Sequence, residues 1–382
     1  MFTLDWRESS QGLSASNDHR PRYAHPLALM ASVKTIGLLA LALWSSLNGR
    51  SAHLLLSARW DSLWYVRVVE HGYSFTLTAP DGRVLSDQAF FPLFPAFEKV
   101  LSHLLHLSPA DAGLLISAAS SLFAGAGIYR LVGMFTDRRT ALLTVALWAT
   151  TPVSIVQSMA YSESLFTAAA AWALCFALQE KWVLAGVLAC AAGLTRPVGI
   201  SVALAIWSAV AISVRREGWS APKVVSFALS PAGFTCYISW VGASRGTPFG
   251  YLDVQSEWGN GYDGGVTFIK FLGTLASTPP YAGGIALLIG VGMVIRTYLL
   301  GFSARYPLPV QVYSGIVIIL ALGSSGFFES KPRLLIPAFS LLIPPALFLS
   351  RKGSTARVSV IASMCMASAA YGALWLNGSG PP

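Results

Sequence analysis

The chain has 382 residues, of which 54% are hydrophobic and only 11% are charged, and its mean hydropathy is +0.59. Because a soluble domain carries about 25% charged residues, this composition excludes an ordinary water-soluble protein and indicates a polytopic membrane protein. The formal net charge of +9 is typical of the basic cytoplasmic loops of membrane proteins. We therefore expect membrane lipids around the chain and no nucleic-acid partner.

The first 26 residues are polar, and we expect them to form a cytoplasmic N-terminal tail. No short apolar core with a small-residue cleavage site opens the chain, so the first apolar run, at about 27–47, is expected to be an uncleaved anchor. A mixed segment follows at 48–110, which we expect to be the first external loop. Its FFPLFP stretch is followed by charged residues and histidines, which favours an interfacial helix over a membrane span.

Apolar runs of about 17 to 25 residues, the length of a membrane span, fill most of the remaining chain. The stretch 182–214 is too long for one ordinary span and carries Arg196 and Pro197 in its middle, so it predicts two short helices that turn at LTRPVG. The other spans are expected near 110–135, 140–159, 165–179, 221–243, 282–302, 308–326, 334–350 and 357–376.

The predicted fold is thus an all-α polytopic membrane domain over 27–376, with about eleven transmembrane helices and with interfacial helices in its first external loop. A short external tail is expected at 377–382. With the N-terminus in the cytoplasm, the loops TDRR, EK, RREGW and RKGSTAR all fall inside. This orientation agrees with the excess of Lys and Arg in cytoplasmic loops.

The same topology brings polar clusters to one face of the membrane. Five clusters fall on the outer face, namely ARWDSLWY, AYSES, LTRP, DVQSEW and ESKPR. Charged side chains at membrane depth cost several kcal/mol and tend to mark sites or pathways. A transporter should place polar groups near the midplane and show repeat symmetry. Polar groups gathered at one interface therefore favour an enzyme that acts on a membrane-bound substrate.

Asp61 is the residue of the first cluster that is hardest to explain structurally, because a carboxylate contributes nothing to membrane anchoring. Its aromatic neighbours Trp60, Trp64 and Tyr65 fit an interfacial aromatic belt as well as they fit substrate contact. Arg59 also has a purely structural reading, since a long basic side chain can snorkel to the interface.

The other polar residues have two readings as well. Glu163 begins an apolar run, where a carboxylate suits the helix dipole, and Arg196 can bond the carbonyls freed at a turn. Lys331 and Arg333 can be flanking anchors, although a positive pair on the outer face opposes the usual loop bias. All four residues are also candidates for a functional site.

Five stretches taken together resemble a known family, the PIG-V-type mannosyltransferases. They are RWDSLWYVRVVEHGY, AFFPLFP, AYSESLF, AGLTRPVG and FFESKPRLLIPAF, in that order over about residues 55–345. Members of this family add the second mannose in GPI-anchor assembly and have bacterial and archaeal relatives. The resemblance implies a GT-C glycosyltransferase architecture with its active site on the non-cytoplasmic face, a polyprenyl-phosphate sugar, such as polyprenyl-phosphate mannose, as the donor, and no cofactor.

The resemblance also suggests roles for individual residues. In GT-C enzymes the catalytic carboxylate commonly lies in the first external loop, so Asp61 is the expected general base of an inverting transfer. A lipid phosphate leaves without protonation but needs nearby positive charge, which we expect from Arg196, Lys331 and Arg333. No carboxylate stands at DxD spacing from Asp61, so we expect no metal. Further donor or acceptor contacts are expected from Arg59, Trp60, Trp64, Tyr65, Tyr161, Glu163 and Gln255.

The chain is short for this family and has no room for the large lumenal insertions of the eukaryotic enzyme. We therefore expect a multi-pass protein of a prokaryotic plasma membrane, whose acceptor is a glycolipid, a polysaccharide or a protein. Mannose as the transferred sugar rests on the resemblance alone. Two alternatives stay open: a flippase or transporter of lipid-linked sugars, and a non-catalytic subunit of a membrane glycosylation complex.

Overall fold

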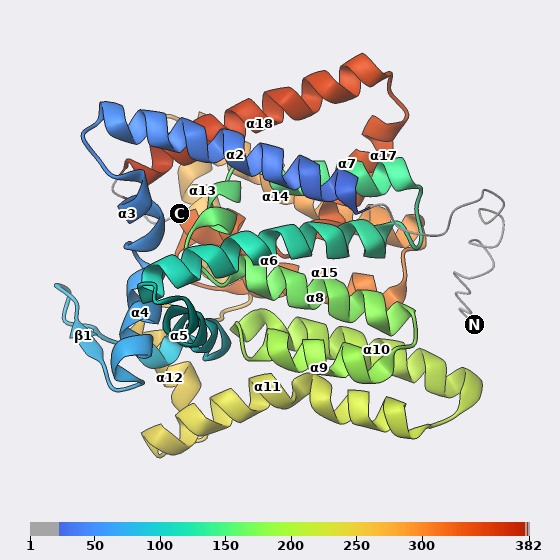
Figure 1. The fold of residues 1–382 in the computed structure, drawn as a ribbon, viewed down its shortest axis with the longest axis horizontal. Helices are drawn as coiled ribbons and strands as arrows, with labels where there is room; N and C mark the ends of the chain where they lie inside the picture. Colours follow the sequence, from blue (N-terminus) through green and yellow to red (C-terminus); the bar gives the residue numbers. More distant parts are fainter. Residues whose placement is uncertain (1–22, 379, 381–382) are drawn as a thin grey trace.

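The structure, a computed structural model, describes residues 23–378 and 380. Most of the predicted N-terminal tail, up to residue 22, and half of the predicted C-terminal tail, residues 379, 381 and 382, therefore lie outside the described residues. Within them the fold is helical except for one small β-hairpin. Figure 1 shows long helices lying side by side across the molecule.

The first described part of the chain contains one long helix and then a run of short elements. In order these are α2 (Ala24–Leu47), α3 (Ala52–Ser57), α4 (Asp61–His71), β1 (Thr76–Thr78), β2 (Val84–Ser86), η1 (Asp87–Ala89) and α5 (Leu93–Leu105). The strands pair antiparallel, with Thr76 opposite Ser86. This hairpin was not predicted, although the PDG between two short β-prone runs is a turn signal.

The remaining elements form the helical bundle. They are α6 (Pro109–Val132), α7 (Arg138–Ala149), η2 (Ser154–Ser158), α8 (Glu163–Leu178), α9 (Trp182–Gly193), η3 (Pro197–Gly199), α10 (Ile200–Glu217), α11 (Ala221–Arg245), α12 (Gly250–Glu257), α13 (Val266–Ser277), α14 (Ala282–Ser303), α15 (Leu308–Gly323), η4 (Phe328–Ser330), α16 (Lys331–Leu334), η5 (Phe339–Leu342), α17 (Ile343–Ser350) and α18 (Ser354–Leu376).

Six helical segments of the described chain are long and apolar enough to cross a membrane, namely α2, α6, η3 with α10, α11, α14 and α18. A seventh candidate is the pair Phe328–Leu334 and Phe339–Ser350, which is bent by 79°. The multi-pass class is therefore confirmed, while the count of eleven spans stays a prediction. Helix α8, for example, has 16 residues, or about 24 Å at 1.5 Å per residue, against a hydrocarbon core of about 30 Å.

The predicted break in the middle of 182–214 is confirmed. Helix α9 ends at Gly193, and Pro197 begins the short 3-10 turn η3 that leads into α10. The turn is tight, since a Cβ on Gly199 would lie 2.5 Å from the Cα of Gly193. Small residues also let α9 and α11 approach closely, because a Cβ on Gly233 would lie 2.0 Å from the carbonyl oxygen of Cys190.

Helix α5 is amphipathic and covers part of α6. Phe94, Glu98 and Ser102 are buried, whereas Val100 and Leu104 are exposed. It is not among the span-length helices of the described residues, as expected for the FFPLFP segment. An exposed apolar face of this kind suits a helix that lies in the membrane interface.

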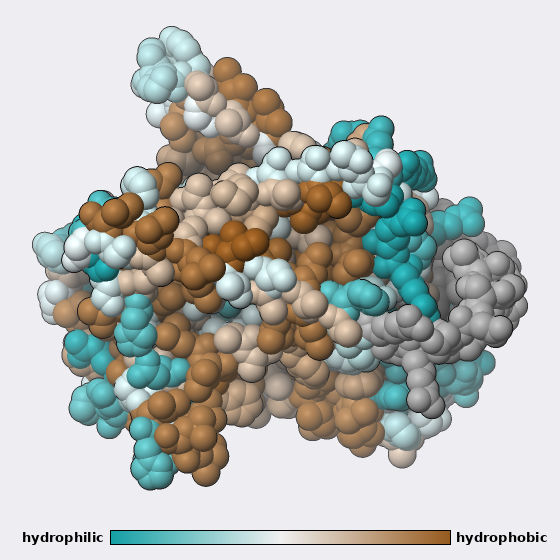
Figure 2. All heavy atoms as spheres, turned by 45° about the horizontal axis from the view of Figure 1, so that its top comes forward, coloured by the Kyte–Doolittle hydropathy of each residue, from teal (hydrophilic) through white to brown (hydrophobic). Residues whose placement is uncertain are grey.

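The elements that carry the predicted outer clusters lie together at one end of the bundle. Figure 1 shows α3, α4, the β-hairpin, α5 and α12 at that end, and the α6–α7, α10–α11 and α17–α18 connections at the other. Figure 2 shows apolar side chains over most of the middle of the molecule, with hydrophilic side chains gathered towards its two ends. This segregation is the one that the sequence predicts, whereas the assignment of the first end to the outside rests on the distribution of basic loops.

Candidate active site

The first three residues of the AYSES segment, 160–162, lie between η2 and α8 as buried, non-helical chain, and its last two residues begin α8. Its backbone is held by neighbouring elements: the Ser117 hydroxyl of α6 donates to the carbonyl of Tyr161 at 2.9 Å, and the amide of Ala160 donates to the carbonyl of Leu56 at 3.0 Å. Irregular chain at this depth is tolerated because such polar groups are paired within the protein. The segment is thus fixed, and with it the side chains of residues 161–163.

Asp61 is the first residue of α4, a position at which the helix dipole favours a carboxylate. The turn before it is tight, and Trp60 has φ of +50°, a conformation that L-residues rarely adopt. The Ser62 hydroxyl braces this turn by donating to the carbonyl of Arg59 at 2.6 Å and accepting from the Arg59 amide at 2.9 Å. Asp61 therefore has a defined position, with 26% of its side chain exposed.

Asp61 belongs to a cluster of four alternating charges drawn from four separate segments of the chain. The Arg333 guanidinium forms ion pairs with both Asp61 and Glu163, through Nη2 and Nε respectively. Oε1 of Glu163 also lies 2.8 Å from Nη1 of Arg196. Glu163 is 1% exposed and Arg333 is 8% exposed, while Asp61 stands at the rim. The structure thus brings the predicted base together with two of the three predicted phosphate ligands.

Two hydroxyl groups join this charge cluster to α4. The Ser162 oxygen lies 2.7 Å from the Tyr65 hydroxyl and accepts from Nη1 of Arg196 at 3.0 Å. Tyr65 is therefore near the cluster, as predicted, but its hydroxyl contacts Ser162 in the buried interior. Ser162 was not predicted as a site residue. The one signal that could have found it is its place between Tyr161 and Glu163.

Tyr161 lies directly against the cluster. Its ring centroid is 4.4 Å from Cζ of Arg333, a cation–π distance. Its hydroxyl is buried and has no hydrogen-bond partner among the described residues. Burial, with the charge of Asp61 nearby, raises the pKa of Tyr161 well above its usual value. The phenol is therefore neutral and has a proton to donate to a ligand that reaches it.

Lys331 is only two residues from Arg333, but it serves a different part of the structure. Its ammonium donates to the carbonyls of Ala321 and Ser324, both at 2.8 Å, and lies 4.6 Å from the ring centroid of Phe268. These contacts satisfy carbonyls at the end of α15, which would otherwise lack partners. In this structure Lys331 contacts neither Asp61 nor Glu163.

Arg59 also makes contacts of its own, away from the charge cluster. Its guanidinium donates to the carbonyl of Leu376 at 2.5 Å and to that of Gly378 at 3.1 Å, at the end of α18. It also lies 3.9 Å from the ring centroid of Trp60. Arg59 therefore fastens the turn before Asp61 to the last helix, and Trp60 packs against its guanidinium.

Trp64 and Gln255, the other two predicted contacts, lie in the layer formed by α4, the β-hairpin and α12. The Trp64 ring stacks on Phe90 and meets Trp258 edge-on, with centroids 5.6 and 4.9 Å apart. Gln255 donates to the Tyr251 hydroxyl at 2.8 Å. Burial raises the pKa of Tyr251, and the charge of Arg196 opposes that rise.

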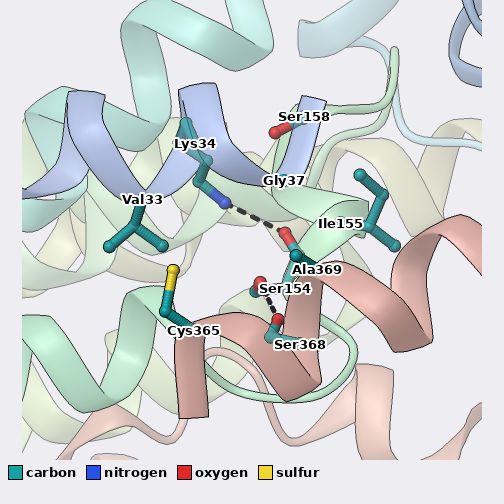
Figure 3. A pocket seen from close by; sticks show the side chains of 9 residues that line it. All are labelled: Val33, Lys34, Gly37, Ser154, Ile155, Ser158, Cys365, Ser368 and Ala369. Carbon is teal, nitrogen blue, oxygen red and sulfur yellow. Dashed lines mark hydrogen bonds between the residues drawn. The ribbon is translucent and has the colours of Figure 1, made fainter. Parts of the chain in front are cut away.

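A half-buried cation on the first membrane helix supports the segment that leads into AYSES. Lys34 of α2 donates to the carbonyl of Ser154 at 2.9 Å and to Oε1 of Gln157 at 2.7 Å. Figure 3 shows this lysine beside a small pocket between α2, η2 and α18. In this pocket the hydroxyls of Ser154 and Ser368 lie 2.8 Å apart. These bonds anchor η2 to the first membrane helix.

Within the described residues, no group of three or more His, Cys, Asp or Glu side chains is arranged to hold a metal ion. The two carboxylates of the charge cluster are instead paired with arginines. The expectation of a metal-free site stays a prediction.

Comparison with protein families identifies one match. A family model described as dolichyl-phosphate-mannose-protein mannosyltransferase matches residues 91–240. The matched part includes Tyr161, Glu163 and Arg196, and excludes Asp61 and Arg333. No curated protein matches the chain.

Solved structures share the fold at low sequence identity. ArnT from Cupriavidus metallidurans bound to undecaprenyl phosphate matches with a TM-score of 0.55 and 14% identity, over 88% of this chain and 62% of ArnT. The apo Archaeoglobus fulgidus oligosaccharyltransferase matches with a TM-score of 0.50 and 12% identity, over 94% of this chain and 57% of that protein. The same enzyme tethered to an acceptor peptide with an NVT sequon gives a TM-score of 0.52 and 12% identity, over 94% and 56%.

The chain thus spans about three fifths of the length of these proteins. The likenesses show that the chain shares the fold of these proteins, and the GT-C assignment stays a prediction. The finer assignment to the PIG-V type stays a prediction. The chain has the polytopic helical fold of ArnT and of the archaeal oligosaccharyltransferase.

Proposed function

We propose that this protein is an inverting membrane glycosyltransferase. It moves a hexose, which we take to be mannose, from a polyprenyl-phosphate sugar to a lipid, glycan or protein acceptor at the non-cytoplasmic face. The observation that carries the proposal is the meeting of Asp61 with Arg333 and Arg196 around Glu163, at the rim of the end where the outer clusters gather. The match to the mannosyltransferase family model and the fold shared with ArnT support it.

In the proposed reaction Asp61 is the general base. Its carboxylate takes the proton of the acceptor hydroxyl while that oxygen attacks the anomeric carbon. The new glycosidic bond forms as the bond from that carbon to the phosphate oxygen breaks, and both electrons of the broken bond leave with the polyprenyl phosphate. One carboxylate suffices because the lipid phosphate is stable as an anion and needs no proton from an acid.

The guanidinium groups of Arg196 and Arg333 hold the departing phosphate in this proposal. Arginine forks match phosphate oxygens in two-point contacts, and charge that builds on a leaving group is best stabilised by preorganised donors. Glu163 preorganises them, since it bonds both guanidinium groups. The neutral Tyr161 phenol contacts the donor, and Lys331 supports the site by fixing α15 against α16.

Transfer can be tested with purified protein, radiolabelled polyprenyl-phosphate mannose and a lipid extract as the acceptor source. The wild type should move label to a new product, and Asp61→Asn should lower the rate about a thousandfold, within the range of a lost general base. Glu70→Gln is the matched control, because Glu70 lies on the same helix and is exposed. Full activity of Asp61→Asn would refute the role of Asp61.

The same preparation separates the alternatives. A flippase would carry labelled lipid across a vesicle without forming a new product, and a non-catalytic subunit would do neither. Lys34, the one Lys, Arg, Asp or Glu side chain of helix α2, is bonded to η2 and is not free to line a path for a lipid-linked sugar. The rim position of the charge cluster therefore favours the enzyme.

A further inference from the structure

Arg333 is shared by two carboxylates that differ in how firmly they hold it. Glu163 is buried and also pairs with Arg196 at 2.8 Å. Asp61 is one-quarter exposed, and in the described residues its carboxylate bonds no side chain other than Arg333. The four side chains sum to a formal charge of zero, so the cluster has no net positive charge to offer an incoming phosphate.

The proposed transfer requires Asp61 to accept a proton and Arg333 to bind a phosphate, and the ion pair between them obstructs both unless it breaks. While Arg333 occupies Oδ2 of Asp61, that oxygen is not free to accept a proton from an acceptor hydroxyl. A phosphate in turn needs the same guanidinium donors. Both requirements are met if the phosphate replaces Asp61 on Arg333.

We propose that the donor phosphate displaces Asp61 from Arg333, so that the event which fills the phosphate site also frees the base. This inference rests on the proposed function and adds an order of events to it. The Asp61–Arg333 pair keeps the base inactive in the empty enzyme, and it reforms when polyprenyl phosphate leaves.

The structure indicates which carboxylate is displaced. Displacing Glu163 from Arg333 would leave this carboxylate, which is 1% exposed, with Arg196 as its remaining ion-pair partner inside the protein, and losing a buried ion pair is strongly unfavourable. Freeing Asp61 exposes a carboxylate that already reaches solvent and lies at the N-terminus of α4, where the helix dipole stabilises it. Arg333 bonds Glu163 through Nε and Asp61 through Nη2, so it can keep the first contact while it exchanges the second.

A binding measurement tests the exchange without catalysis. Binding of a short-chain polyprenyl phosphate is measured for the wild type, Asp61→Asn, Arg333→Gln and the double variant. Because Asn competes poorly for Arg333, Asp61→Asn should bind about fivefold tighter than the wild type, the scale of one partly exposed ion pair. The gain should disappear in the Arg333→Gln background.

Other results of this cycle have distinct meanings. Unchanged or weaker binding by Asp61→Asn overturns the exchange, and so does an equal gain in the Arg333→Gln background, which reports only the removal of a negative charge. Failure of the wild type to bind polyprenyl phosphate, together with no transfer, refutes the proposed function itself and the exchange with it.

A second measurement uses the wild-type chain and covers the case in which Arg333→Gln does not fold. Carbodiimide coupling of an amine to carboxyl groups is followed by peptide mass spectrometry. Coupling at Asp61 should rise severalfold when polyprenyl phosphate is added, while coupling at the exposed Glu70 stays constant. Equal or lower coupling at Asp61 in the presence of the lipid would contradict the exchange.

Discussion

Arg196 and Glu163 meet through Nη1 and Oε1 at 2.8 Å, and the same carboxylate oxygen also accepts from Arg333. One buried carboxylate therefore holds two arginines that come from different parts of the chain. In the proposed enzyme this makes Glu163 the residue that positions the phosphate ligands, while Asp61 at the rim performs the proton transfer. Substitution of Glu163 should consequently cost mainly stability, whereas substitution of Asp61 should cost mainly transfer activity.

Glu163→Gln should be strongly destabilising. The change leaves two guanidinium groups without their buried counter-charge, at a cost of about 3 to 5 kcal/mol. Asp61→Asn removes a partly exposed partner of one arginine and should cost no more than about 1 kcal/mol. Thermal unfolding of both variants in the same detergent checks the contrast, and equal losses would show that Glu163 is not the central anchor.

Arg59→Gln should slow transfer without weakening donor binding. Arg59 bonds the carbonyls of Leu376 and Gly378 and so fixes the turn that presents Asp61. We expect kcat to fall about tenfold, the effect of a small misplacement of the base, with the donor KM unchanged.

Arg50→Gln is the control for Arg59, because Arg50 bonds the carbonyl of Asn377 at the same helix end but lies outside the Asp61 turn. Arg59→Lys should restore part of kcat, since one carbonyl can still be bonded. A rise in donor KM for Arg59→Gln, with kcat unchanged, would instead make Arg59 a direct donor contact.

Lys331→Met and Arg333→Gln should distinguish a residue that stabilises the fold near the site from one that binds the donor phosphate. Lys331 bonds carbonyls at the end of α15, so its loss leaves buried acceptors unsatisfied and should cost about 1 to 3 kcal/mol of stability. The donor KM of the Lys331→Met variant should remain near that of the wild type. Arg333→Gln should raise the donor KM at least tenfold. If the two changes raise the donor KM equally, Lys331 binds the donor phosphate, as the sequence predicts.

Glu98 should make stability depend on pH. It is fully buried, both its oxygens lack a hydrogen-bond partner in the described residues, and burial raises its pKa well above the usual value. Because the folded-state pKa is the higher one, the protonated form favours folding, and its contribution is complete below the unfolded-state pKa. Stability should then fall as pH rises towards the folded-state pKa.

Thermal unfolding measured from pH 5 to pH 9 checks this prediction. Glu98→Gln, which cannot ionise, should flatten the profile and raise stability at the alkaline end. Glu70→Gln, an exposed change on α4, should leave the profile as in the wild type. A wild-type profile that rises with pH would show that Glu98 is ionised in the folded protein.

Local pattern determined several features of this protein. Low charge and long apolar runs predict the membrane class, and Pro197 after Arg196 predicts the break between α9 and α10, because proline cannot continue the hydrogen bonding of a helix. The segregation of basic loops from polar clusters predicts which segments share an end of the bundle. These predictions succeed because each depends on composition or on neighbouring residues alone.

Pairing within the site was decided by the tertiary structure. Lys331 and Arg333 are two residues apart on a helix, so their side chains leave it in nearly opposite directions. Only the packing of α16 decides that Arg333 faces Asp61 and Glu163 while Lys331 faces the end of α15. The sequence by itself therefore supplied the charged residues and the end of the bundle where they gather. The tertiary structure decided their partners, because ion pairs between distant segments depend on how helices pack and not on spacing along the chain.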